Sequence, residues 1–145
     1  MDTIVKWNEG LQFKGTGWSN HGVTIDTDPS HDGLDQGPSP VELLLMSVAG
    51  CTGMDVVSIL KKMKVEFDRF EIGVTGDRAE EHPRIFHNMQ LVYQIWGDNI
   101  DEKKLNKAID LSMNRYCTVS NTLKQGIDIT YSYEVNPEKE MEVDA

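Results

Sequence analysis

The chain has few cysteines and few positively charged residues. Each shortage excludes some classes of function. Among 145 residues, 14 Lys and Arg face 24 Asp and Glu, so the formal net charge at pH 7 is −10. A negative chain is not drawn to phosphate backbones or to anionic lipid. We therefore expect neither nucleic acid nor a membrane surface among its partners.

Secretion and membrane signals are also missing. The start, residues 1–7, has neither the basic start nor the apolar run of a signal peptide. The longest apolar stretch, 41–60, is interrupted by polar groups such as Asp55, which predicts a buried helix and not a membrane span. Two cysteines without a secretion signal indicate a reducing compartment, so the cytoplasm is the expected location.

Motifs for a bound metal are absent as well. The two cysteines, Cys51 and Cys117, lie 66 residues apart and form no Cys-x-x-Cys pair. The acidic loop after Asp26 lacks calcium-site spacing, because His31 and Gly37 stand where Gly and Glu are required. We therefore expect no bound metal.

The order of expected elements is strands, helix, strands, helix, strand, which predicts an α+β fold. Residues 1–135 are expected to form one domain, and 136–145 an acidic C-terminal tail. The first three strands should form an antiparallel meander. Expected strands lie at 4–7, 11–13, 23–25, 70–74, 89–95 and 127–133; expected helices run over 39–64 and from 101 through about 123.

The first helix has a strong start and an unusual composition. Ser39 and Glu42 have the spacing of a capping box, and Pro40 suits the first helical position. The helix is apolar nearly all round, which predicts that protein encloses most of it. Gly50 and Gly53 flank Cys51 and permit a break or a close backbone approach there.

The second helix should begin at Asp101 as N-cap and place a shared face near the second cysteine. Leu105, Ile109, Ser112 and Tyr116 lie on that face, and Cys117 follows directly. Buried cysteines often serve only as small hydrophobic residues. The thiols can meet if the two helices pack together, but the sequence does not establish their register.

Two segments resemble signatures of the OsmC/Ohr family, and within it the YhfA-like subgroup. They are Gly37-Pro38-Ser39-Pro40-Val41-Glu42-Leu43-Leu44-Leu45, leading to Gly50-Cys51-Thr52, and Tyr116-Cys117-Thr118-Val119-Ser120. The opening Val5-Lys6-Trp7 and the closing strand 127–135 are also similar to that family. The resemblance implies an OsmC-like fold and an intertwined homodimer with its sites at the subunit interface.

The resemblance also implies a thiol peroxidase cycle without a cofactor. Cys51 would attack an organic hydroperoxide and become a sulfenic acid, and Cys117 would resolve it as a disulfide. A dithiol or a lipoylated protein would then reduce that disulfide. An antioxidant or stress-response role would follow.

The sequence departs from the peroxidase pattern in the groups that stabilise the thiolate. Family peroxidases use an early Arg held by a Glu ten residues before the first cysteine; here that position is Val41, and no Arg precedes Arg69. Glu42, Arg84 and Arg115 are the supporting candidates, with Lys6 and Lys14 as other sources of positive charge. Asp55 would share the face of Cys51 and raise the thiol pKa.

Three functions are therefore distinguished. The first is reduction of organic hydroperoxides through Cys51 and Cys117. The alternative is a non-enzymatic OsmC-like protein whose thiols are structural and whose dimer interface binds a small apolar ligand. A thiol hydrolase or transferase is a third interpretation, but no base for it is identifiable.

Overall fold

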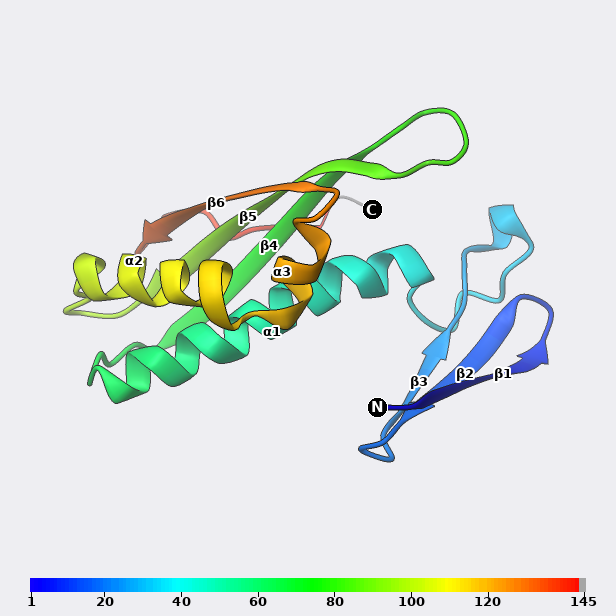
Figure 1. Cartoon of the computed structure of the whole chain (residues 1–145), viewed down its shortest axis with the longest axis horizontal. Coiled ribbons are helices and arrows are strands. Elements are labelled where there is room, and N and C mark those ends of the chain that lie inside the picture. Colours follow the sequence, from blue (N-terminus) through cyan, green and yellow to red (C-terminus); the bar gives the residue numbers. More distant parts are fainter. Residues whose placement is uncertain (144–145) are drawn as a thin grey trace. The chain divides into compact units, whose positions relative to one another are not determined.

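The first part of the chain is built on a three-stranded antiparallel meander (Figure 1). The structure, a computed structural model, describes residues 1–143, and it divides into two units, Met1–Leu44 and Leu45 onward. The strands are β1 (Thr3–Glu9), β2 (Gln12–Gly17) and β3 (Gly22–Ile25). The predicted meander is confirmed.

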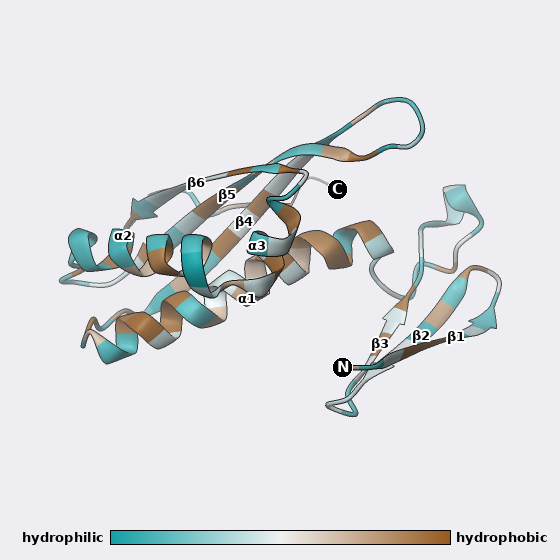
Figure 2. Cartoon of the chain, in the orientation of Figure 1, coloured by the Kyte–Doolittle hydropathy of each residue, from teal (hydrophilic) through white to brown (hydrophobic). Residues whose placement is uncertain are grey.

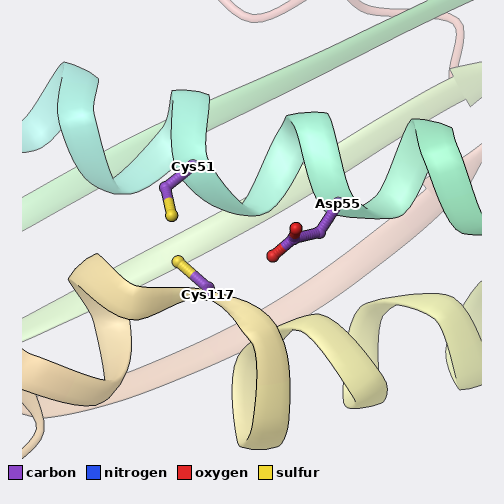
Figure 3. A group of neighbouring side chains, drawn as sticks. All are labelled: Cys51, Asp55 and Cys117. Carbon is purple, nitrogen blue, oxygen red and sulfur yellow. The ribbon is translucent and has the colours of Figure 1, made fainter.

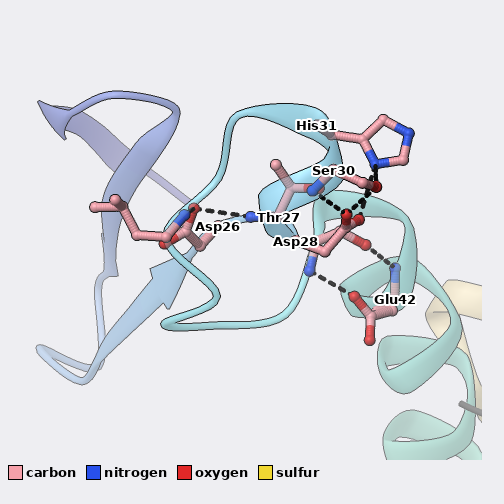
Figure 4. A network of polar contacts seen from close by, with 8 residues as sticks. Asp26, Thr27, Asp28, Ser30, His31 and Glu42 are labelled. Carbon is pink, nitrogen blue, oxygen red and sulfur yellow. Dashed lines mark hydrogen bonds and ion pairs between the residues drawn. The ribbon is translucent and has the colours of Figure 1, made fainter.

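A buried carboxylate organises the loop that follows β3. Asp26 is only 2% exposed and accepts hydrogen bonds from the backbone N–H groups of Thr27, Leu34 and Gln36 and from the Gln12 side chain. Burial raises the pKa of Asp26, but these hydrogen bonds outweigh it, and the net pKa is lowered. One side chain therefore fixes both ends of an irregular segment (Figure 4).

Asp26→Asn should lower the midpoint of urea unfolding at pH 7, because an amide nitrogen would face N–H donors. A lowered folded-state pKa stabilises the protein above the unfolded pKa of about 3.9 and loses that effect as the pH falls through the folded value. The gap between wild type and variant should therefore shrink in acid. Asp32→Asn, at an exposed position of the same loop, is the control; an equal loss in the two variants would contradict the role of Asp26.

The long helix α1 (Pro40–Lys62) starts with the predicted capping box. The Ser39 N–H donates to Glu42 Oε2 at 2.7 Å, and the Glu42 N–H donates to Ser39 Oγ at 3.3 Å (Figure 4). These two bonds satisfy backbone donors that otherwise lack partners at a helix start. The sequence signal and the structure agree at this point.

The second unit contains a three-stranded sheet in the order β4 (Arg69–Arg78), β5 (Phe86–Trp96), β6 (Asp128–Val135). Strands β4 and β5 are antiparallel, whereas β5 and β6 are parallel. A parallel pair needs a long crossover. Here it contains α2 (Glu102–Leu111), a π-helical turn (Ser112–Tyr116) and α3 (Thr118–Leu123). The mixed α+β class is as predicted.

Helices α1 and α2 cover the same face of this sheet (Figure 1). Tyr93 of β5 lies opposite Ile72 of β4 and Tyr133 of β6, so these three side chains share that face. The Tyr93 hydroxyl contacts Thr52 of α1, and the Tyr133 hydroxyl contacts Glu102 of α2. The core of the unit therefore lies between the sheet and the helices.

The C-terminal segment crosses the opposite face. Trp96 Nε1 donates to the carbonyl of Pro137, and Arg69 pairs with Glu140 while its guanidinium lies 4.4 Å from the Trp96 ring centroid. Met141 fills the space above Gly73. The predicted acidic tail thus packs on the sheet through Met141, and its last two residues, 144–145, lie outside the described range.

The expectation that protein encloses α1 on most sides is not met by a single chain. Its buried residues form one stripe, Val48, Thr52, Val56 and Leu60. By length and composition α1 is apolar enough to cross a membrane, and 22% of its most apolar window is buried. Figure 2 shows apolar residues around much of this helix, and Met46 and Met54 are 56% and 78% exposed.

The face predicted for the second helix is correct up to Ser112 and wrong at Tyr116. Leu105, Ile109 and Ser112 are buried, but Tyr116 is 50% exposed. The π-helical turn explains the difference, because a hydrogen bond five residues back inserts one extra residue and rotates the residues after it. Here the N–H of Cys117 donates to the carbonyl of Ser112 at 2.8 Å.

Candidate thiol site

Two free cysteines lie side by side within the second unit (Figure 3). Cys51 comes from the middle of α1, and Cys117 from the junction between the π-helical turn and α3. Their sulfur atoms lie within 4.8 Å of each other. The proximity of the thiols that the family resemblance implies is confirmed, although their separation in the sequence is large.

Helix α1 holds Cys51 because it runs without interruption through Gly50 and Gly53. Gly53 allows a close approach instead of a break: a Cβ there would lie 2.9 Å from Cδ1 of Ile72 on β4. A side chain at that position would have to displace the end of the Ile72 side chain. Cys51 remains partly exposed.

Cys117 is held more tightly. It is fully buried and acts as N-cap of α3, with its sulfur accepting from the Ser120 N–H at 3.4 Å. Its carbonyl accepts from Asn121 Nδ2 at 2.8 Å. The buried Cys117 sulfur thus lies beside the Cys51 sulfur and is closed to solvent in this chain.

Asp55 is the third member of the cluster, one helical turn after Cys51 as predicted. Ser112 Oγ donates to Asp55 Oδ2 at 3.0 Å and lies 2.9 Å from Thr52 Oγ1, which lies 2.7 Å from the Tyr93 hydroxyl. Each hydroxyl carries a single proton, and the ionised carboxylate only accepts. These hydrogen bonds connect Tyr93, Thr52, Ser112 and Asp55 in one network. Burial raises the pKa of Tyr93 well above its ordinary value, which keeps this proton in place.

The surroundings of Cys51 favour the neutral thiol. Burial raises its pKa most; the hydrogen bond from the Val119 N–H lowers it, and the Cys117 thiol and the charge of Asp55 raise it further. The net pKa is above the ordinary value of 9.0. The predicted effect of Asp55 on this pKa has the expected sign.

The supporting residues named from the sequence have other interactions. Glu42 is engaged in the capping box with Ser39. The Arg115 guanidinium lies over the Tyr116 ring, 5.4 Å from its centroid, and Arg84 is exposed in the connection from β4 to β5. The structure thus places each of these three side chains in surroundings other than the thiol pair.

Sequence reasoning missed the groups that surround the thiols. Ser112, Thr52 and Tyr93 were visible only as members of apolar patterns, and the Val119 N–H has no side-chain signal. A buried polar side chain at a core position requires a partner. Thr52 and Ser112, each one small polar residue on an apolar helix face, were the available signals.

Comparison with known proteins places this geometry in a family. Residues 32–132 match the family of OsmC-like proteins. The chain is 38% identical to "Protein YhfA" of Escherichia coli K12 over 135 residues, covering 93% of this chain and 98% of that protein. A hypothetical protein from Aquifex aeolicus VF5 is 30% identical, with a TM-score of 0.81 over 95% and 97% of the two chains.

A more distant structure has the same fold. The organic hydroperoxide resistance protein OhrB of Bacillus subtilis is 19% identical, with a TM-score of 0.62 over 92% of this chain and 98% of that chain. The sequence match extends over most of the chain, and the two cysteines lie side by side. This chain belongs to the OsmC-like protein family.

Proposed function

We propose that the protein reduces organic hydroperoxides through Cys51 and Cys117. The main support is the pair of free thiols, whose sulfur atoms lie within 4.8 Å of each other. Cys51 is partly exposed and Cys117 is buried. An external peroxide can reach Cys51, and the product on Cys51 has Cys117 beside it. The structurally similar OhrB of Bacillus subtilis is an organic hydroperoxide resistance protein, which supports the same substrate class.

The proposed cycle has three balanced steps. The Cys51 thiolate attacks the peroxide oxygen; the O–O bond breaks, and the sulfenic acid and an alcohol form after one proton is taken up. The Cys117 thiol then attacks the Cys51 sulfur, releasing water and forming a disulfide. A dithiol or a lipoylated protein supplies two electrons and two protons, returns both thiols and leaves as its own disulfide.

The backbone of α3 supplies the local support for this chemistry. The Val119 N–H donates to the Cys51 sulfur and lowers the thiol pKa, so it favours the reactive form. The hydrogen bond lowers the Cys51 pKa, whereas burial and the Asp55 charge raise it. This lowering needs no arginine. On this ground we propose that the protein is a slow peroxidase. We also propose the cytoplasm as its location.

The test is consumption of an organic hydroperoxide, such as cumene hydroperoxide, in the presence of dihydrolipoamide. Wild type should turn over repeatedly and Cys51→Ser should not. Absence of turnover by wild type above the rate of the free dithiol would reject the proposal.

A non-enzymatic role is the second candidate, and the raised pKa of Cys51 favours it. In that case the thiols would be packing groups, and the protein would bind a small apolar ligand. Native protein would resist alkylation at both cysteines, and hydroperoxide would leave both reduced. These results separate it from a slow peroxidase, in which Cys51 is modified first.

We further propose a homodimer, supported by the apolar surface that each unit leaves exposed. Trp7 and Trp18 in the first unit are 65% and 69% exposed, and Met54 on α1 is 78% exposed. Covering such surface is the usual reason for association. Light scattering at micromolar concentration should give about twice the chain mass of 16.4 kDa. A mass that stays at the single-chain value would contradict this.

A further inference from the structure

The cluster of Cys51, Asp55 and Cys117 has the composition of a metal site. Two sulfur atoms and a carboxylate oxygen lie within 4.8 Å of one another (Figure 3). We propose that the reduced protein binds one zinc ion through these three side chains. This revises the expectation of no metal, which rested on the spacing of the cysteines in the sequence.

The distances suit zinc after a small adjustment. Zinc bonds are about 2.3 Å to sulfur and about 2.0–2.2 Å to carboxylate oxygen. In a tetrahedral site, two bound sulfurs are therefore separated by about 3.8 Å, and a sulfur and an oxygen by about 3.5 Å. The observed limit of 4.8 Å exceeds these values by an amount that side-chain rotation can close.

The backbone presents the three ligands from two rigid elements. Cys51 and Asp55 are four residues apart on the continuous helix α1, so their side chains share one face. Cys117 approaches from the end of the π-helical turn, whose geometry is fixed by its bond to the Ser112 carbonyl. Three protein ligands leave a fourth position, which water can occupy because Cys51 is partly exposed.

Hydrogen bonds already orient the ligands as an outer shell of a metal site does. Ser112 Oγ holds Asp55 Oδ2, the Ser120 N–H donates to the Cys117 sulfur, and the Val119 N–H donates to the Cys51 sulfur. Such partners set the direction of ligand atoms and strengthen binding.

The negative charge of Asp55 also supports a metal site. A carboxylate beside two thiols opposes thiolate formation, and that disfavours a peroxidase. The same carboxylate favours a divalent cation, and binding replaces two thiol protons with one zinc ion, releasing both protons to water. Two thiolates select soft ions such as zinc over magnesium or calcium.

The proposal deepens the proposed function, because it involves the same two thiols. A disulfide between Cys51 and Cys117 removes both sulfur ligands, so oxidation and zinc binding exclude each other. Bound zinc would hold the thiols out of the peroxidase cycle, and one hydroperoxide molecule per chain would expel the ion. Zinc binding itself needs only the reduced cysteines.

The test is a zinc titration of reduced, tag-free, metal-stripped protein against a chromogenic chelator. Wild type should bind one ion per chain. Cys51→Ser and Cys117→Ser should each abolish stoichiometric binding, and Ser112→Ala should weaken it about 10- to 100-fold through the lost support of Asp55. His31→Ala is the control, since the exposed Asp28–His31 pair is the rival weak site; it should bind like wild type.

Cobalt(II) provides a second readout, because thiolate-to-cobalt absorption reports sulfur ligation directly. Wild-type binding without that absorption, or equal zinc affinity in Cys117→Ser with a native circular dichroism spectrum, would overturn the site. So would no binding by a wild type that still reduces hydroperoxide. Zinc that binds but is not released by hydroperoxide would uphold the site and reject the peroxidase.

Discussion

Cys51→Ser should reduce dithiol-dependent hydroperoxide consumption to the rate of the free dithiol, whereas Cys117→Ser should stop after one turnover when no external thiol is present. The first variant lacks the sulfur that attacks the peroxide. The second retains it but has no neighbour to resolve the sulfenic acid. Both substitutions are nearly isosteric, so the fold should survive. Burst stoichiometry, followed as peroxide consumed per chain, measures the difference.

Trapping the intermediate makes the assignment sharper. Dimedone should label Cys51 in Cys117→Ser after one equivalent of peroxide, and mass spectrometry should find little label in wild type. Addition of a small monothiol should restore turnover to Cys117→Ser and not to Cys51→Ser. The reverse pattern, with Cys117 labelled in Cys51→Ser and turnover retained there, would exchange the two roles.

Local patterns were sufficient for much of the fold. The capping box at Ser39 and Glu42, the N-cap at Asp101 and the meander follow from short-range chemistry, and the structure has all of them. The meeting of Cys51 with Cys117 does not follow from such patterns. It depends on the packing of α1 against the crossover, and only the family resemblance pointed to it.

Several features of the site could not be predicted from the sequence pattern. The π-helical turn shifts Tyr116 to the surface and brings Cys117 to the thiol pair, and no residue type announces such a turn. Ser112 lies at the helical spacing of the core residues, but its hydroxyl donates a hydrogen bond to Asp55. The burial of α1 was overestimated because the apolar pattern does not say whether the same chain supplies the cover.

The rate of Cys51 oxidation should rise about tenfold for each pH unit through the neutral range. The pKa of this thiol is raised by burial, so the thiolate is a minor form below its ordinary value of 9.0. A group below its pKa loses a factor of ten in the deprotonated fraction per unit of pH. Single-turnover mixing with hydroperoxide under a pH series measures this slope. A flat profile from about pH 6 to 8 would mean that the thiolate is already formed, contrary to the surroundings of Cys51.

Asp55→Asn should raise that rate at pH 7 about fivefold and leave the plateau at high pH unchanged. The Asp55 charge raises the pKa of Cys51, and a unit charge at 4–5 Å contributes about 1 kcal/mol even in water, a factor of about five. The asparagine oxygen can still accept from Ser112, which preserves the local packing. Asp98→Asn, which removes the same charge from the exposed turn before α2, should leave the profile unchanged. A slower Asp55→Asn variant would show instead that the carboxylate assists the reaction, since its charge alone acts against the thiolate.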